Sequence, residues 1–234
     1  MGKEELKQEI ITTVKREYKN QMVNMFEGNV SAKWGESIFI TPSQVSKEII
    51  TADMLIEMDL QGNIIHQPDG FRPSSETKMH LEVYRLRPDV KAVVHNHSLY
   101  ATAYAVNNMP LESDALTEMN ITFGSVPVVP YGTPGTDRIY EKFPEYIMNR
   151  YAVLLANHGV LTFGRTLELA YSYAEAVEKI AQTLYVAGRL GPAANIPAEE
   201  AEALRQYGAA KREAEIRRYT QELAEYVGVI NEDI

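Results

Sequence analysis

Three histidines occupy positions from which their side chains could bind one metal ion. His95 and His97 follow an apolar run, and residues at i and i+2 of a strand point to the same face. His158 follows a second apolar run, and the glycine after it permits a tight turn. Three neutral imidazoles leave a divalent ion its full charge and an open position, as a catalytic zinc site requires. The spacing therefore predicts a metal site built from His95, His97 and His158.

Each histidine also has a structural interpretation. An isolated His-x-His pair is more often a hydrogen-bonded structural pair than a metal site, so the prediction depends on His158 as a third ligand. His66 lies in a polar loop, and His80 is four residues after Glu76 on a predicted helix. A contact between the side chains of Glu76 and His80 is a simpler expectation than metal binding. Neither His66 nor His80 is expected among the ligands.

Hydroxyl groups and a carboxylate occur together in Ser74-Ser75-Glu76, where a helix is predicted to begin. The unpaired N–H groups of a helix N-terminus favour anions, so a phosphate could bind there. The same three residues are also an ordinary helix-capping sequence. Asn29 and Ser31 form a second predicted polar turn with the same two interpretations.

The composition limits both the partners and the ligands. The chain has 234 residues, of which 45% are hydrophobic, and a net charge of -9, which disfavours nucleic acid and anionic membrane as partners. Because the chain has no cysteine, a metal site must use nitrogen and oxygen ligands. The charged first 20 residues contain no apolar run of signal-peptide or membrane length, which predicts a cytoplasmic protein.

Helical and strand patterns alternate along the chain. Helical spacing is expected over 3–25, 74–85, 167–190 (capped by Thr166) and 198–226, and short β-rich runs cover 91–95, 126–129 and 152–156. Residues 28–42 are predicted to form turn, short strand and turn, and 60–64 a hairpin turn. This order predicts an α/β sandwich in one domain, 1–234. The charged helical tail, about 198–234, has little apolar surface and needs a neighbour to pack on.

Six short motifs resemble the class II aldolase and adducin family. They are GNVS at 28–31, ITPS at 40–43, PSSE at 73–76, VVHNH at 93–97, PYGTPGT at 130–136 and NHG at 157–159. They follow the family's order and spacing over almost the whole chain. The resemblance implies a three-layer α/β/α sandwich with a central, mostly antiparallel sheet. It also implies a homotetramer whose active sites lie at subunit contacts.

The resemblance implies a role for each candidate residue. The three histidines would bind Zn²⁺, or another divalent ion such as Mn²⁺ or Co²⁺, and Glu76 would be the acid/base. A phosphate site would be lined by Asn29, Ser43, Ser74 and Ser75. Tyr207 would reach over a neighbouring subunit's site. The implied reaction is retro-aldol cleavage of a ketose 1-phosphate, such as L-fuculose 1-phosphate, to dihydroxyacetone phosphate and an aldehyde.

Several residues depart from the family's pattern. Phe26, Glu27 and Gln44 replace smaller residues beside the expected phosphate pocket, and the carboxylate of Glu27 is expected to weaken phosphate binding. A second family tyrosine aligns near Leu116, with Glu118 nearby. A sugar-phosphate epimerase is disfavoured because that branch carries aspartate where this chain has Glu76. A dehydratase or a decarboxylase on the same metal scaffold stays open as an activity, and so does a non-enzymatic, adducin-like interaction module.

Overall fold

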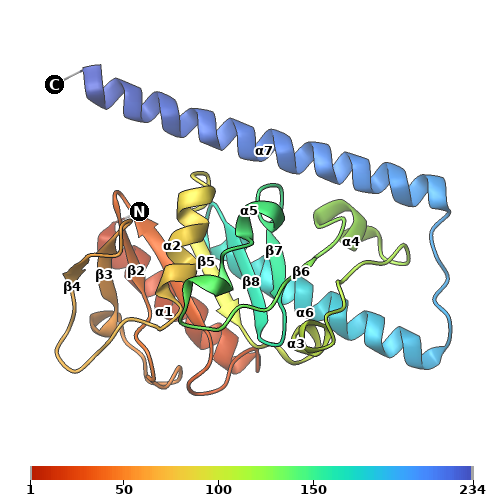
Figure 1. Cartoon of the computed structure of the whole chain (residues 1–234), viewed down its shortest axis with the longest axis horizontal. Coiled ribbons are helices and arrows are strands. Elements are labelled where there is room, and N and C mark those ends of the chain that lie inside the picture. The colour runs from red at the N-terminus through yellow and green to blue at the C-terminus, as the bar shows by residue number, and fades with distance from the viewer. Residues whose placement is uncertain (1, 233–234) are drawn as a thin grey trace.

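The computed structural model describes residues 2–232, with side chains as far as residue 222. Over these residues, eight strands form one sheet in the order β4-β3-β2-β1-β5-β8-β7-β6 (Figure 1). The strands are β1 (Asn29–Trp34), β2 (Ser37–Ile40), β3 (Ile56–Asp59), β4 (Ile64–His66), β5 (Ala92–Asn96), β6 (Val128–Val129), β7 (Ala152–Leu155) and β8 (Gly159–Gly164). Neighbouring strands are antiparallel except β6 and β7, which are parallel. The expected mostly antiparallel sheet is confirmed.

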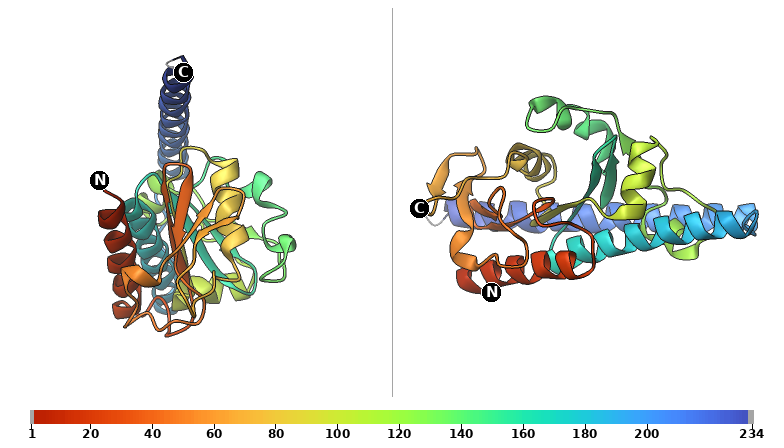
Figure 2. Two further views of the ribbon diagram at one scale, coloured as in Figure 1. Left: turned by 90° about the vertical axis from the view of Figure 1, so that its left-hand side faces the viewer. Right: turned by 90° about the horizontal axis from the view of Figure 1, so that it is seen from below.

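Helices cover both faces of this sheet. They are α1 (Lys3–Lys19), α2 (Thr77–Leu86), α3 (Leu99–Val106), α4 (Thr117–Thr122), α5 (Phe143–Tyr146), α6 (Leu167–Leu190) and α7 (Ala198–Glu232), with short 3-10 turns η1 (Ala52–Met54) and η2 (Asp137–Ile139). Figure 2 shows α1 and α6 on one side of the sheet and α2 and α5 on the other. The three-layer arrangement is therefore confirmed.

Alternation along β5 determines which side chains face which layer. Ala92 and Val94 pack in a core cluster with α1 and α6, whereas Val93 packs in the cluster that contains α2 and α5. A residue two positions after Val93 faces the α2 layer as well. His95 therefore points toward the same side of the sheet as α2.

The residues around Asn29 correct one sequence-based expectation. A polar turn was expected at 28–31, but Asn29 begins β1, which pairs with β2 on one side and β5 on the other. Only Gly28 has the backbone of a turn, with φ 73°, and a Cβ there would lie 2.9 Å from the carbonyl oxygen of His95. Asn29 and Ser31 are buried because β1 is a central strand rather than part of a surface loop.

Helix boundaries follow local capping. The Thr166 side chain accepts a hydrogen bond from the N–H of Leu169, as expected for the start of α6. The first helix ends at Lys19 instead of continuing to residue 25. Helix α2 begins at Thr77, so Glu76, and not a serine, is its N-cap residue.

Helix α7 crosses the end of the sheet where β7 begins. Its residue Glu215 accepts a hydrogen bond of 2.7 Å from the hydroxyl of Tyr151, which directly precedes β7. Gly208 permits close contact with α4, because a Cβ there would lie 2.0 Å from the backbone oxygen of Ile121. Figure 1 shows α7 running above the strands and extending past the sheet. Within the described part of the chain, no helix combines the length and apolar character needed to cross a membrane.

Candidate functional site

The candidate metal centre lies where β5 ends and β8 begins. Asn29 of β1 is the register partner of His95 on β5, so both side chains lie on the face that α2 covers. His158 lies in the turn between β7 and β8. Gly159 permits this turn to approach β5, because a Cβ at that position would lie 2.5 Å from the backbone oxygen of Asn96. Strands β1 and β5 and the turn between β7 and β8 thus meet at this site, although they are far apart in the sequence.

The structure brings His95, His97 and His158 into one cluster. One nitrogen from each ring lies within 4.8 Å of the corresponding nitrogens of the other two. The Nε2 atoms of His95 and His97 are 3.1 Å apart. This is close to the edge of about 3.3 Å expected for two nitrogens of a tetrahedron with metal bonds of about 2.0 Å. The donor set and its spacing fit a divalent ion.

One hydrogen bond and one nearby carboxylate, both outside the cluster, favour the tautomers that a metal needs. The Nδ1 atom of His95 lies 2.8 Å from the carbonyl oxygen of Val160, so this nitrogen carries the proton. The Nδ1 atom of His97 faces the Glu27 carboxylate at 3.6 Å. Both Nε2 atoms are then unprotonated, and their lone pairs face each other. A cation between them removes the resulting repulsion.

Burial keeps these two imidazoles neutral. Removal from water lowers the pKa of His95 to about 3, although the nearby Glu76 charge acts in the opposite direction. Burial and the neighbouring His158 also lower the pKa of His97. Neutral imidazole is the form that binds metal, so both rings are ready to act as ligands at neutral pH.

Glu76 lies directly beside the histidines. Its Oε2 is 3.3 Å from Nε2 of His95, and its Oε1 is 3.1 Å from Nε2 of His158. Burial opposes ionisation of this carboxyl, but the two histidines and a hydrogen bond from Asn29 together hold its pKa below the ordinary value. Its Oε1 and Nδ1 of His158 are both buried without a hydrogen-bond partner. A buried carboxylate oxygen without a hydrogen-bond partner, beside a cluster of histidine nitrogens, indicates a place for an ion or a substrate.

A chain of buried hydrogen bonds supports Glu76 from behind. Asn29 donates to Oε2 of Glu76 at 2.7 Å, and its amide oxygen lies 2.5 Å from Nε2 of His80. The other ring nitrogen of His80 is 2.7 Å from the hydroxyl of Ser31, which in turn contacts the Tyr84 hydroxyl at 2.8 Å. His80 therefore reaches Glu76 through Asn29, rather than by the direct contact expected from helical spacing.

This supporting chain was largely missed by sequence reasoning. The signal was present, because His80 and Tyr84 are four residues apart on one helix face and Asn29 and Ser31 alternate on one strand face. Recognising this chain of hydrogen bonds required knowing that helix α2 packs on strand β1.

Burial lowers the pKa of His80 to about 4, so its ring is neutral and can both donate and accept a hydrogen bond.

The serines assigned to phosphate come from two adjacent segments. Pro42 and Pro73 form an isolated antiparallel bridge, and the N–H of Ser43 donates to the carbonyl oxygen of Arg72 at 2.8 Å. Ser43 is therefore close to the turn that precedes α2. The Ser74 hydroxyl accepts a hydrogen bond from the N–H of Glu76 at 3.3 Å, whereas Ser75 is exposed.

Two further side chains lie beside these serines. The Arg72 guanidinium donates to the Gln44 side chain at 3.4 Å. Gln44 has φ 57°, the left-handed conformation that favours glycine, and the family resemblance implies a smaller residue there. Arg72 was not identified from the sequence, and it adds a positive charge to the segment that carries the serines.

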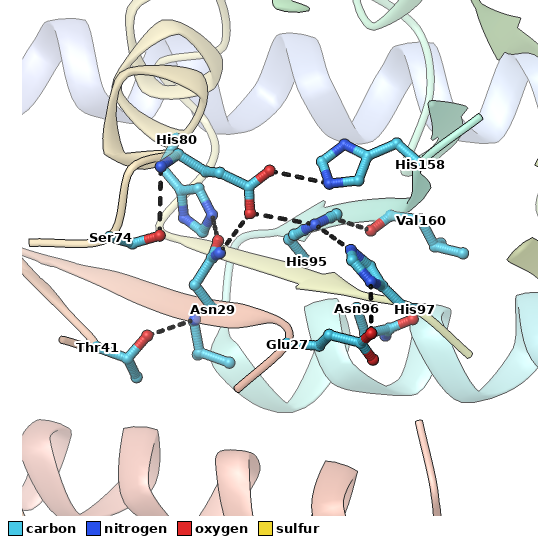
Figure 3. Close-up of polar contacts among 12 residues, drawn as sticks. Glu27, Asn29, Thr41, Ser74, His80, His95, Asn96, His97, His158 and Val160 are labelled. Atoms are coloured by element: carbon cyan, nitrogen blue, oxygen red, sulfur yellow. Dashed lines mark hydrogen bonds and ion pairs between the residues drawn. The ribbon is translucent and has the colours of Figure 1, made fainter. Parts of the chain in front are cut away.

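Glu27 lies on the histidine side of the site and not next to the serines. Figure 3 shows Glu27 next to His97, whereas Ser74 lies on the far side of His95. The loop before Glu27 is held by Asn24, whose side-chain oxygen accepts from the N–H groups of Phe26 and Glu27 at 2.9 and 3.0 Å. This position revises the expected effect of Glu27 on a phosphate, because the carboxylate lies beside the ring of His97. A hollow of about 590 Å³, lined by Glu27, His97 and Leu99 among others, opens here.

Tyr207 lies at the opposite end of the sheet from the histidines of its own chain. It is on α7, which contacts Tyr151 before β7, whereas His158 follows the end of β7. Its side chain is 62% exposed. A catalytic role for Tyr207 therefore requires a second copy of the chain.

Comparison with known proteins gives a consistent result. The family described as "Class II Aldolase and Adducin N-terminal domain" has a model that matches residues 8–185. L-fuculose phosphate aldolase of Escherichia coli O6:H1 is 36% identical over 155 residues, which cover 66% of this chain and 71% of that protein. The protein of the same name from Haemophilus influenzae is 33% identical over 183 residues, covering 77% and 82%.

Solved structures agree with the sequence comparisons. An L-fuculose 1-phosphate aldolase superimposes with a TM-score of 0.80 and 31% identity, covering 88% of this chain and 97% of that chain. YgbL from Klebsiella pneumoniae, described as a putative aldolase/epimerase/decarboxylase, has a TM-score of 0.79 and 28% identity, with coverage of 88% and 100%. The matched residues include all three histidines and Glu76, since they fall within 8–185.

Proposed function

Because the chain belongs to the class II aldolase and adducin family, we propose that it is a metal-dependent aldolase that cleaves a ketose 1-phosphate. The products would be dihydroxyacetone phosphate and an aldehyde, as for an L-fuculose 1-phosphate-like substrate. One observation carries this proposal: three imidazoles converge beside a buried, ionised carboxylate, Glu76. Burying a charged carboxylate beside three histidines costs free energy, and a non-enzymatic, adducin-like interaction module would not need this arrangement.

His95, His97 and His158 would hold the ion, which is proposed to be zinc or another divalent metal. When bound, such an ion stabilises the negative charge that develops on the ketose oxygens as the carbon–carbon bond breaks. Glu76 is ionised at the start of the reaction, so it would first take up the proton that the substrate hydroxyl loses and then deliver a proton to the carbon released by cleavage; in the reverse direction it would accept the proton from that carbon. Asn29 holds Oε2 of Glu76, which leaves Oε1 available to the substrate.

The substrate phosphate would bind at the two adjacent segments that carry Ser43, Ser74 and Ser75. Arg72 lies on the same segment and supports this assignment, because a guanidinium binds phosphate well. Asn29 supports Glu76, and its amide retains a second N–H for the substrate. The exposed position of Tyr207 on α7 supports a homotetramer in which this tyrosine reaches a neighbouring subunit's site.

A substrate screen tests the proposal. The metal-loaded protein is incubated with a panel of phosphorylated ketoses, and both dihydroxyacetone phosphate and aldehyde are measured, with a Glu76→Gln protein as control. We expect one ketose 1-phosphate to yield both products in equal amounts. Loss of carbon dioxide, loss of water or a change of stereochemistry, without cleavage, would instead identify a decarboxylase, a dehydratase or an epimerase. Turnover that survives Glu76→Gln would contradict the assigned acid/base.

A further inference from the structure

A second charged hollow lies between α7 and the segment around α4. It has a volume of about 490 Å³, and three arginines line it: Arg150, Arg205 and Arg212. Arg150 directly precedes β7, whereas His158 follows it, so this hollow and the histidine cluster lie at opposite ends of that strand. Figure 1 shows α4 below the first half of α7. None of the residues assigned to the aldolase reaction lines this hollow.

Two of these arginines lack an acidic partner. Arg150 donates to the backbone oxygen and the hydroxyl of Ser125, both at 3.2 Å. Arg212 donates to the backbone oxygens of Ile121 and Thr122 at 3.2 and 3.0 Å. Among the side chains that the structure describes, no carboxylate is within ion-pair distance of either guanidinium. Two positive charges therefore share one hollow in a protein whose net charge is -9.

Burial makes this arrangement costly without an anion. Arg212 is only 6% exposed, and its Nε atom is buried without a hydrogen-bond partner. Burial lowers the pKa of Arg150, and burial together with the charge of Arg150 lowers the pKa of Arg212. A buried guanidinium is ordinarily compensated by a carboxylate or a phosphate.

The other lining residues suit an anion. Ser113 and Ser125 supply hydroxyl groups, and guanidinium and hydroxyl donors together match the acceptors of an oxyanion. Two acidic residues also line the hollow. Asp114 is already paired with Arg205, and Glu112 is exposed. Two guanidinium groups and one carboxylate, that of Glu112, thus line the hollow without an ion pair, so the net unpaired charge is positive.

We propose that this hollow is a second ligand site, which binds a compact dianion, a phosphate group or a small dicarboxylate, between Arg150 and Arg212. Such a ligand would join the segment after α4, the start of β7 and helix α7. It would therefore stabilise the position of α7 against the sheet. Within one chain this site is separate from the proposed catalytic site, because the hollow and the histidine cluster lie at opposite ends of β7.

Calorimetric titration of the full-length protein tests this proposal, with inorganic phosphate and succinate as separate probes. We expect at least one probe to bind, and Arg150→Gln to weaken that binding roughly tenfold or more, because a charge-assisted hydrogen bond is lost. Arg212→Gln is the second test variant. Arg217→Gln is the matched control, because Arg217 lies on the same helix but is exposed and paired with Glu213 at 2.7 Å.

A Ser75→Ala protein separates this site from the proposed catalytic phosphate site. Binding that Arg150→Gln removes should persist in Ser75→Ala, whichever reaction the enzyme performs. The affinities for phosphate and for succinate are then compared: the probe that binds more tightly shows whether the site prefers a phosphate group or a small dicarboxylate. The proposal is overturned if neither probe binds, or if folded Arg150→Gln protein, checked by circular dichroism, titrates like the Arg217→Gln control.

Discussion

The carboxylate of Glu27 lies 3.6 Å from Nδ1 of His97, on the side of the ring that faces away from the histidine cluster. A carboxylate in this position keeps the proton on Nδ1 and leaves Nε2 free to bind a metal. The family resemblance implies a smaller residue at this position, so the carboxylate is one of the expected departures of this chain from the family's pattern. We therefore expect Glu27 to influence metal binding through His97.

Replacing Glu27 should weaken metal binding. We expect Glu27→Gln and Glu27→Ala to reduce affinity for a divalent ion by roughly tenfold, as is usual for partners that orient a metal-binding histidine. Competition with a coloured chelator measures this directly, without substrate. Glu48→Gln, at an exposed glutamate, is the control. Unchanged affinity in both Glu27 variants would show that the contact has no effect on His97.

The purified protein should contain about one divalent ion per chain. Elemental analysis of parent, His95→Ala and His158→Ala proteins measures this content. We expect each substitution to remove most of the ion, because the three ligand nitrogens lie within 4.8 Å of one another and act together. Equal metal content in all three proteins would disprove the assigned ligands.

Glu76→Gln should reduce turnover by roughly two to four powers of ten, the usual contribution of a general acid/base. The amide has nearly the same shape, so Asn29 keeps a hydrogen-bond acceptor and the fold should persist. Steady-state rates, together with metal content and melting temperature, separate catalysis from folding. If the variant matched the parent rate, the carboxylate would be only the N-cap of α2.

The homotetramer prediction can be tested together with the role of Tyr207. Sedimentation should give four chains, and both Glu76→Gln and Tyr207→Phe proteins should be slow. If Tyr207 acts on a neighbouring subunit, co-expression of the two variants should restore about a quarter of the sites, because those sites combine the Glu76 of a Tyr207→Phe chain with the Tyr207 of a Glu76→Gln chain. A fully active monomer, or co-expressed protein no faster than the separate variants, would remove the role across the interface.

His80 should make the protein less stable in acid. Its pKa falls from 6.5 in the unfolded chain to about 4 in the fold, so the folded state binds fewer protons. Stability is therefore lost as pH falls below 6.5, by about 2 kcal/mol at pH 5. Urea unfolding of the parent and of His80→Gln at pH 7 and pH 5 measures the difference. We expect the parent to lose more stability than the variant, and equal losses would contradict this assignment.

Local sequence was sufficient to predict the parts of the site that depend on spacing. His95 and His97 are two residues apart at the end of an apolar run, and the period of a strand places them on one face. Gly159 indicated the turn that brings His158 close to β5. The helix cap at Thr166 and the mostly antiparallel α/β fold followed from similarly local signals and from the family resemblance.

Tertiary structure decided the partners of these residues. Asn29 was expected in a polar turn, but pairing with β5 places it beside His95, and packing of α2 brings Glu76 and His80 to its amide. Glu27 likewise faces His97 because of how its loop folds back, which no spacing within the loop indicates. Contacts between segments far apart in sequence depend on strand order and helix packing, whereas residue spacing predicts only which side chains share a face.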